Sequence, residues 1–226
     1  MQDFNDSKNS YQTSIEHSIG FAGQGLDFYT QVKADFLKEI AQKYFPSQRV
    51  ELLDVGCGHG LIHRKLDGFS ISATDIAGEV LKLAQQENPS VTYLPYDGTA
   101  LPFESGRFDM SLAICVMHHV PPAAWVAFLQ EMKRVLKPGG MAIIIEHNPL
   151  NPMTCHVVKN SPLDEGVTLL HARTLKKRMR EAGFVQSKHE YLVFTPFAQK
   201  LMRRFDRWLK WCPLGAQHAA LGLTGR

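Results

Sequence analysis

Two hydrophobic periods alternate along the chain and predict a regular series of strands and helices. Short apolar runs predict strands at 49–55, 70–75, 91–96, 107–115, 141–145, 185–195 and 216–223. Apolar residues at three- and four-residue spacing predict helices at 25–44, 61–68, 77–88, 121–136, 174–183 and 197–211. The helix at 121–136 has the clearest pattern, with prolines in its first turn and the sequence KPGG at its end.

Strand and helix alternate from residue 50 to residue 184, which is the pattern of a doubly wound parallel α/β sheet. The run 141–145 is apolar without alternation, as expected of a parallel strand covered on both faces. No internal repeat or linker divides the chain, and we therefore expect one domain over 1–226. Three parts of it are expected to lie on the substrate side: an N-terminal helical cap, an irregular stretch and a basic helix, at 1–45, 147–172 and 196–213.

The composition is that of an ordinary globular protein, with 44% hydrophobic and 21% charged residues in a chain of 226. No segment holds the roughly 20 consecutive apolar residues that span a bilayer, and the N-terminus lacks the pattern of a secretory signal. The four cysteines form no C-x-x-C pair, which argues against a zinc site and a disulfide framework. A histidine-based metal site also has little support from the spacing of histidines along the chain. The sequence thus predicts a cytoplasmic protein without a bound metal.

Basic residues concentrate in the C-terminal third. Between Arg173 and Lys210 there are eleven Lys and Arg but three Asp and Glu, although the net charge of the chain is only +3. Part of this charge lies on an amphipathic helix, whose apolar stripe consists of Phe197, Leu201, Phe205, Trp208, Leu209 and Cys212. We expect this helix to pack its aromatic face on the sheet edge or to cover a pocket. A peripheral membrane contact through 197–212 is the alternative.

A glycine-rich turn follows the first predicted strand, where Asp54 precedes Gly56, Cys57, Gly58 and Gly60. In doubly wound sheets ligands bind beyond the carboxyl ends of the strands, so this turn is the expected ligand site. The third glycine comes one residue too early for the dinucleotide fingerprint G-x-G-x-x-G, and no G-K-[ST] of a phosphate-binding loop follows. The carboxylate of Asp54 is unfavourable next to a negatively charged pyrophosphate but suits a cationic or hydroxyl-bearing ligand.

The turn LLDVGCGHG resembles motif I (D-x-G-x-G-x-G) of the class I S-adenosylmethionine-dependent methyltransferases. Four further segments resemble that family in the expected order: SATDIAGEVLKLA, YLPYDGTALPFESGRFD, FDMSLAICVMHHV and RVLKPGGMAIII. The resemblance implies a Rossmann-like fold of three αβα layers, whose seven-stranded sheet is mostly parallel with an antiparallel last strand. It also implies that S-adenosylmethionine is the cofactor and S-adenosylhomocysteine the product.

By the same resemblance, Asp75 accepts hydrogen bonds from both ribose hydroxyls, Asp97 accepts one from the adenine amino group, and the Gly98 amide faces a ring nitrogen. Taken alone, Asp75 also reads as a helix N-cap and Asp97 as a turn residue. The full set expected at the cofactor is Asp54, Gly56, Cys57, Gly58, Gly60, Asp75, Ile76, Asp97, Gly98 and Cys115.

Histidines stand where the acceptor of a methyl group would lie. A hydroxyl acceptor loses a proton as it attacks, and histidine is the usual base near neutral pH. His118 and His119 follow the fourth strand and His147 closes the fifth, so these three are the candidate catalytic residues. A structural, hydrogen-bonded histidine is the competing interpretation, particularly for His119. The chain has CVMHHVPP where several amino-group methyltransferases carry [DNS]-P-P-[YFW], which disfavours adenine or glutamine N-methylation.

We therefore predict methyl transfer to a small or medium-sized acceptor, at oxygen. The segments HNPLNPMT and CPLGAQHAALGL are similar to bacterial methyltransferases associated with glycan or lipid modification. Two alternatives stay open: a module that binds S-adenosylmethionine without catalysis, and a nicotinamide-dependent oxidoreductase, against which the glycine spacing argues. No nucleic-acid partner is expected, because no recognised binding module is present.

Overall fold

A seven-stranded sheet forms the centre of the computed structural model, which describes residues 25–225. The strand order is β3-β2-β1-β4-β5-β7-β6. The strands are β1 (Val50–Val55), β2 (Phe69–Asp75), β3 (Thr92–Pro95), β4 (Phe108–Ile114), β5 (Leu136–His147), β6 (Gln186–Leu192) and β7 (Gln217–Leu223). β7 runs antiparallel to β5 and β6, and the other pairings are parallel. The predicted mostly parallel sheet with an antiparallel last strand is confirmed.

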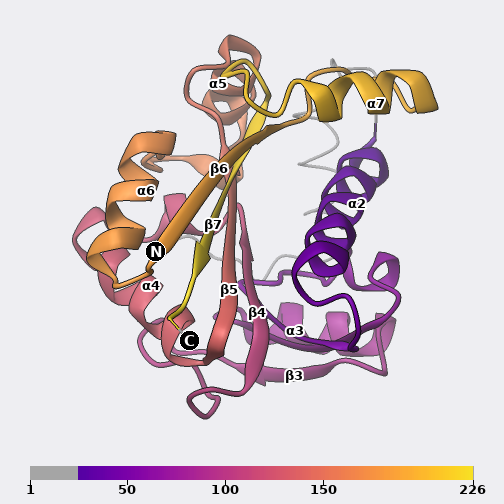
Figure 1. The fold of residues 1–226 in the computed structure, drawn as a ribbon. Coiled ribbons are helices and arrows are strands. Elements are labelled where there is room, and N and C mark those ends of the chain that lie inside the picture. Colours follow the sequence, from indigo (N-terminus) through magenta and orange to yellow (C-terminus); the bar gives the residue numbers. More distant parts are fainter. Residues whose placement is uncertain (1–24, 226) are drawn as a thin grey trace.

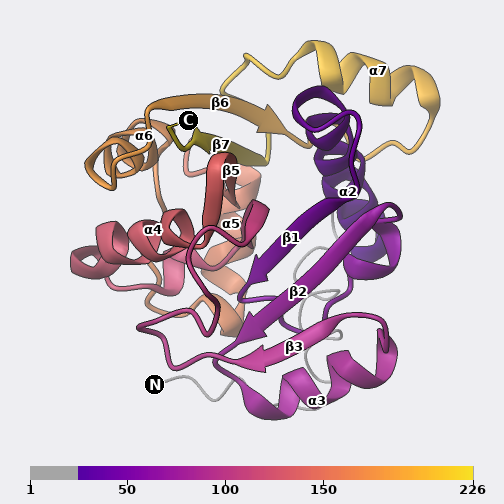
Figure 2. The ribbon, with the colours of Figure 1, turned by 60° about the horizontal axis from the view of Figure 1, so that its bottom comes forward.

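Helices cover both faces of the sheet, as the predicted three-layer fold requires (Figure 1). α4 (Trp125–Arg134) and α6 (Ala172–Glu181) lie on one face, and α2 (Leu26–Tyr44) lies on the other. α3 (Gly78–Glu87) packs beside β2 and β3 at the far edge (Figure 2). The part of the expected N-terminal cap that precedes residue 25 lies outside the described residues.

The core explains why these segments become helices. In α4 the buried side chains are Trp125, Phe128, Leu129 and Met132, whose spacing places them on one face of the helix. They pack with α6 against one side of the sheet, while Phe36, Leu37 and Ile40 of α2 pack against the other. Burying each large apolar side chain contributes about 1.5–3 kcal/mol, so these stripes hold the layers together.

Three predicted elements differ in the structure. The helix expected at 61–68 is a single 3-10 turn, η2 (His63–Lys65). The helix expected to reach residue 136 ends at Arg134, because β5 already begins at Leu136, which pairs with Phe108. The KPGG sequence lies inside β5, where the pairing with β4 is irregular. The stretch 147–172, expected to be irregular, contains α5 (Pro152–Asn160) and η5 (Pro162–Asp164). Its helix begins at Asn151, whose side chain accepts a hydrogen bond from the Thr154 amide at 3.0 Å.

The basic helix α7 (Lys200–Trp208) faces the opposite way from the expectation. Its basic side turns toward α2 and β6, because Arg207 and Lys210 pair with Glu39 and Lys210 also pairs with Glu190. Its apolar side is therefore left on the surface, where Leu201, Phe205 and Trp208 are exposed. The prediction that this aromatic face packs on the sheet edge or covers a pocket is wrong.

α5 and α7 lie at the same end of the molecule, at the top of Figure 1. Among the helices in residues 25–225, none combines the length and the apolar character needed to cross a membrane.

Candidate functional site

A cavity of about 640 Å³ opens at the carboxyl ends of β1, β2, β4 and β5. Leu26, Tyr29, Thr30 and Lys33 of α2 close one side of it, and residues of α5 and η5 close another. The segment that links β6 to α7 contributes Val193 to Pro196. Residues of the expected cap and of the 147–172 stretch thus reach the cavity, whereas among the described residues of the expected part 196–213 only Pro196 lines it.

The glycine turn forms the floor of the cavity beside β1. Gly56 and Gly58 have φ angles of 73° and 52°, a region that glycine adopts without steric cost. A Cβ on Gly56 would lie 2.5 Å from a methyl carbon of Val116, so a side chain cannot be added there without displacing Val116. The amides of Gly56 and Cys57 both donate to the Thr74 carbonyl, which ties the turn to β2.

Asp75 ends β2 with its carboxylate directed at the turn. Its Oδ2 accepts a hydrogen bond from the Gly58 amide at 2.8 Å, and its Oδ1 accepts one from the Ala77 amide at 3.0 Å. Burial raises the pKa of Asp75, although these two amides act in the opposite direction. Each oxygen keeps a further lone pair, so the carboxylate can still accept hydrogen bonds from a diol.

Asp54 lies on the β1 side of the turn, where it is buried and also lines the cavity. Its Oδ2 is 3.0 Å from His63 Nε2, and His63 Nδ1 is 2.7 Å from the Tyr93 hydroxyl. This chain of three polar side chains packs under Gly60, where a Cβ would lie 2.5 Å from the Tyr93 oxygen. Gly60 is therefore required by packing beneath the turn, and it does not line the cavity.

Two other predicted cofactor residues, Asp97 and Ile76, are both exposed, but only Ile76 lines the cavity. Asp97 is exposed, and its Oδ1 accepts hydrogen bonds from the Thr99 amide, the Thr99 hydroxyl and the Ala100 amide. Asp97 thus caps a turn and does not line the cavity, whereas its neighbours Tyr96 and Gly98 do. Ile76 lines the cavity with 59% of its surface exposed, as an apolar shelf beside Asp75.

Backbone strain occurs at this cavity as well. Within residues 25–225 the non-glycine residues with positive φ are Cys115, at 54°, and Val193, at 62°. Both line the cavity, and such strained residues cluster at functional sites. Burial raises the pKa of the Cys115 thiol to about 11, and its sulfur accepts a hydrogen bond from Gln217 Nε2 at 3.4 Å.

The three predicted catalytic histidines also line this cavity, and their rings lie close together. His118 is buried, with Nδ1 2.5 Å from Glu146 Oε2 and Nε2 3.2 Å from Asp164 Oδ1. Glu146 is wholly buried, and its other oxygen accepts a hydrogen bond from the Met117 amide at 2.7 Å. Burial opposes a charge on His118, but the two carboxylates outweigh burial and raise the pKa of His118 to about 10.

His119 and His147 line the same space in a different electrostatic setting. Burial, followed by the charge on His118, lowers the pKa of each to about 4. His119 Nε2 is 3.7 Å from Asp164 Oδ1, and a quarter of the His119 side chain is exposed. The His147 ring centre lies 5.3 Å from that of His118. This part of the cavity, lined by His118, His119 and His147, thus holds one charged and two neutral imidazoles.

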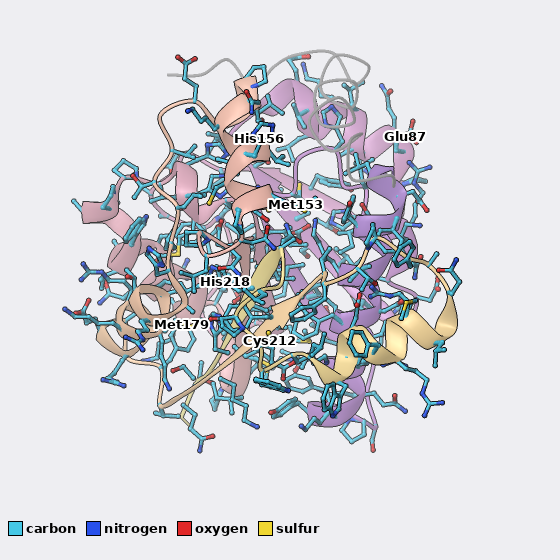
Figure 3. The ribbon with its side chains drawn as sticks, turned by 90° about the horizontal axis from the view of Figure 1, so that it is seen from above. Glu87, Met153, His156, Met179, Cys212 and His218 are labelled. Carbon is cyan, nitrogen blue, oxygen red and sulfur yellow. The ribbon has the colours of Figure 1, made fainter. Side chains whose placement is uncertain are left out.

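The segment HNPLNPMT is tied to the segment that precedes β7. The Asn148 side chain donates to the carbonyls of Pro213 and Gly215, and the Asn151 side chain donates to that of Leu214. The Thr154 hydroxyl donates to the Ala216 carbonyl at 2.8 Å. Figure 3 views this end of the molecule and labels Met153, whose side chain lines the cavity. Both segments singled out in the sequence therefore build one wall of the site.

Comparison with known proteins decides the family. Residues 53–144 match the family described as "Methyltransferase domain". The chain is 27% identical over 135 residues to a malonyl-[acyl-carrier protein] O-methyltransferase of Erwinia pyrifoliae, covering 58% of this chain and 50% of that protein. It is 33% identical over 133 residues to a ubiquinone biosynthesis O-methyltransferase of Cereibacter sphaeroides, covering 55% of this chain and 53% of that protein. A solved methyltransferase structure from Thermotoga maritima matches with a TM-score of 0.69 and 19% sequence identity. The match covers 96% of this chain and 95% of that one.

The chain belongs to the class I S-adenosylmethionine-dependent methyltransferases. The solved structure supports this through its fold alone, and the chain spans about half the length of the curated relatives above. The cofactor of the family is S-adenosylmethionine, and the methyltransferase has a donor set that suits it. Carboxylates at Asp54 and Asp75 fit a sulfonium and a ribose better than a pyrophosphate, and the amides of Gly56, Cys57 and Gly58 already donate to acceptors within the protein. The nicotinamide alternative is therefore not supported.

Of the residues predicted at the cofactor, the methyltransferase brings eight to one cavity: Asp54, Gly56, Cys57, Gly58, Asp75, Ile76, Gly98 and Cys115. Sequence reasoning missed Asp164 and the partnership of Glu146 with His118. Asp164 is 46 residues from His118 along the chain, in a stretch without periodicity, and no local signal marks it. His63 was also missed, because it was assigned to a helix that the fold does not form.

Proposed function

We propose that this methyltransferase transfers the methyl group of S-adenosylmethionine to an oxygen of a small or medium-sized, lipid- or glycan-related acceptor. One observation carries the proposal: a single cavity is lined both by the glycine turn with Asp75 and by His118, His119 and His147. The first group suits the nucleoside part of the donor, and the second suits a hydroxyl that must lose a proton.

The division of roles among the histidines follows from their contacts. When bound, S-adenosylmethionine supplies a methyl carbon that bonds to the acceptor oxygen while the electrons of the broken C–S bond remain on sulfur. His119 takes the acceptor's proton, since its side chain is partly exposed at the cavity. His118 does not, because each of its ring nitrogens already faces a carboxylate oxygen. His118 instead fixes Asp164 and the η5 segment against β5.

Oxygen is favoured over nitrogen on two grounds. The fourth strand ends in CVMHHVPP and lacks the motif of several amino-group methyltransferases. Both curated relatives named above are O-methyltransferases by their printed names. The cavity walls add that the acceptor has an apolar part, because Leu26, Met153, Val157 and Leu163 contribute to them.

An amphiphilic acceptor would reach the cavity from a membrane surface. Leu201, Trp208 and Trp211 are 75%, 67% and 68% exposed, and they follow the segment Phe194 to Pro196 that lines the cavity. Exposed tryptophans beside cations such as Arg204 are typical of helices that lie in the interface of an anionic bilayer. We place the protein in the cytoplasm with this face on the membrane, and its four free cysteines suit that compartment.

The test of activity is a two-step assay with the full chain. Calorimetry should give binding of S-adenosylhomocysteine and none of NAD. Radiolabelled S-adenosylmethionine is then supplied with phenols, carboxylic acids and lipid-linked acceptors in anionic vesicles, and the product is analysed by mass spectrometry. We expect an O-methyl product, and a lower turnover for His119→Asn with unchanged S-adenosylhomocysteine affinity. Binding without transfer to any acceptor would support the non-catalytic module, and an N-methyl product would refute the oxygen assignment.

The test of membrane contact is sedimentation with vesicles. The wild type should sediment with anionic vesicles more than with neutral ones, and Trp208→Ala with Trp211→Ala should reduce that fraction several-fold. Val185→Ala is the matched control, since Val185 is equally exposed but lies away from α7. Equal sedimentation of the tryptophan variant and the wild type would contradict the proposed surface.

A further inference from the structure

We infer that His118, His147 and Asp164 form a binding site for a divalent transition-metal ion. One ligand atom from each residue lies within 4.8 Å of the others, although the residues come from η3 (Met117–His119), β5 and η5. His118 Nε2 and Asp164 Oδ1 are 3.2 Å apart. Two ligands that bind one ion at about 2.0–2.2 Å stand roughly 3.3–3.6 Å from each other in tetrahedral geometry, so this separation is close to that of ligands to a shared ion.

Glu146 supplies the support that a metal-binding histidine requires. Its Oε2 lies 2.5 Å from His118 Nδ1, and its Oε1 is fixed by the Met117 amide. A histidine that donates from Nδ1 to a carboxylate presents Nε2 as a ligand, and metal-binding histidines almost always have such a partner. The Glu146–His118 pair therefore orients Nε2 toward Asp164, and a bound ion would take the place of the Nε2 proton that His118 carries in its charged form.

Charge and ligand type narrow the choice of ion. Glu146 is wholly buried and the Asp164 side chain is 14% exposed, so two carboxylates converge on His118 away from bulk water. That concentration of negative charge favours a dication. Two imidazoles and one carboxylate suit zinc, iron or cobalt rather than magnesium or calcium. The prediction from sequence that no metal is bound rested on spacing along the chain, and the three ligands meet only through the fold.

The ion would serve the proposed methyl transfer, and this part of the inference rests on that function. All three ligand residues line the cavity, so coordination positions not taken by protein face the space for the acceptor. A hydroxyl or carboxylate of the acceptor would bind there. The ion would fix that oxygen in the cavity and make a hydroxyl more acidic, which are two recognised roles of metal ions in catalysis.

The decisive measurement is metal binding by the full chain, read independently of activity. The protein is freed of metal with a chelator and titrated with Zn²⁺ against a chromophoric competitor. We expect one Zn²⁺ per chain, bound with a Kd of about 1 μM or tighter. His147→Ala and Asp164→Ala should each weaken binding by more than about 10-fold, and Glu146→Gln by about 10–100-fold. His156→Ala is the matched control, because His156 is an exposed histidine of α5 outside the cluster (Figure 3), and it should leave the Kd unchanged.

A second probe guards against variants that fold poorly. His147→Gln and Asp164→Asn keep the size of each side chain, and circular dichroism checks that each variant is folded. Co²⁺ added to the wild type should give visible absorption bands that folded His147→Gln lacks. A wild type that binds Zn²⁺ no more tightly than folded His147→Gln overturns the metal site, whether or not methyl transfer is observed. Zn²⁺ binding that depends on these residues, without methyl transfer to any acceptor, supports the site and overturns the proposed function instead.

Discussion

The Asp75 carboxylate accepts a hydrogen bond from the Gly58 amide at 2.8 Å, and this contact joins the end of β2 to the glycine turn after β1. The contact leaves Asp75 in a fixed position at the cavity, with its second oxygen held by the Ala77 amide. Asp75 is not the helix N-cap that the sequence also suggested, because Ala77 holds that position in α3 without a side-chain cap. The Asp75 carboxylate accepts from the Ala77 amide and lines the cavity.

Replacing Asp75 by Ala should weaken the binding of S-adenosylhomocysteine by roughly 10–100-fold, through the loss of charge-assisted hydrogen bonds. Isothermal calorimetry measures the change. Asp67→Ala is the control, since the Asp67 side chain is 89% exposed and pairs only with Lys38 among the described contacts. An affinity equal to that of the wild type would exclude Asp75 from the ribose site.

The Gly56→Ala variant should lose about 1–3 kcal/mol of unfolding free energy. The added Cβ would meet Val116 at 2.5 Å, and the φ of 73° is unfavourable for alanine. Urea denaturation gives the free energy of unfolding. Gly78→Ala serves as the control, because a Cβ there meets nothing within 4 Å and alanine favours the helix that begins at this residue. Equal free energies of unfolding for the two variants would show that the Val116 side chain moves aside without loss of stability.

Arg134 fastens the loop that carries Gly98 to α4. Its guanidinium donates to the carbonyls of Leu101 and Phe103 and pairs with Glu131, which in turn accepts from the Leu101 amide. Lysine cannot reproduce this planar set of donors, so Arg134→Lys should cost about 1–2 kcal/mol of unfolding free energy. Arg178→Lys, on a helix where the arginine pairs with Glu181, should cost less than about 0.5 kcal/mol. The same urea experiment compares them, and equal losses would argue against a loop-fastening role.

The donor end of the site could be predicted because its signals are local. Apolar runs locate β1 and β2, and the residues that follow each strand must meet at one edge of a parallel sheet. Asp75 and the turn from Gly56 to Gly58 were found in this way. The acceptor end depends on contacts between distant segments, and Asp164 reaches His118 only because α5 and η5 fold over the ends of the strands. The hydrophobic periodicity of a segment does not indicate which distant part of the chain it will contact.

The orientation of α7 shows the same limit for a regular element. Its stripe was recognised, but the side that faces the protein depends on acidic partners elsewhere. Glu39 on α2 and Glu190 on β6 draw Arg207 and Lys210 inward, and the aromatic side turns outward. Hydrophobic patterning alone would bury that side, so long-range ion pairs have to be known before the surface can be assigned.

The stability of the protein should fall as the pH drops below about 6.5, in part through His189 on β6. Burial, then the neighbouring His218 and Lys176, lowers the pKa of His189 to about 3. The rings of His189 and His218 are 4.8 Å apart, and neither nitrogen of His189 has a hydrogen-bond partner among the described residues. The ordinary pKa of histidine is about 6.5. Between about pH 3 and pH 6.5, the unfolded chain therefore binds a proton at His189 and the folded chain does not. The stability is therefore fully present above about pH 6.5 and is lost progressively as the pH falls toward 3.

Replacing His189 by Phe should remove this contribution. From pH 7 to pH 5 the wild type should lose about 1–2 kcal/mol more unfolding free energy than His189→Phe, as measured by urea denaturation at each pH. Burial also lowers the pKa of His218, His119 and His147, so a smaller slope of the same sign should persist in the variant. His156→Phe, at an exposed position, should keep the slope of the wild type. If His189→Phe loses as much stability as the wild type over this range, the pH dependence arises from other groups, because a side chain that cannot titrate contributes no proton linkage.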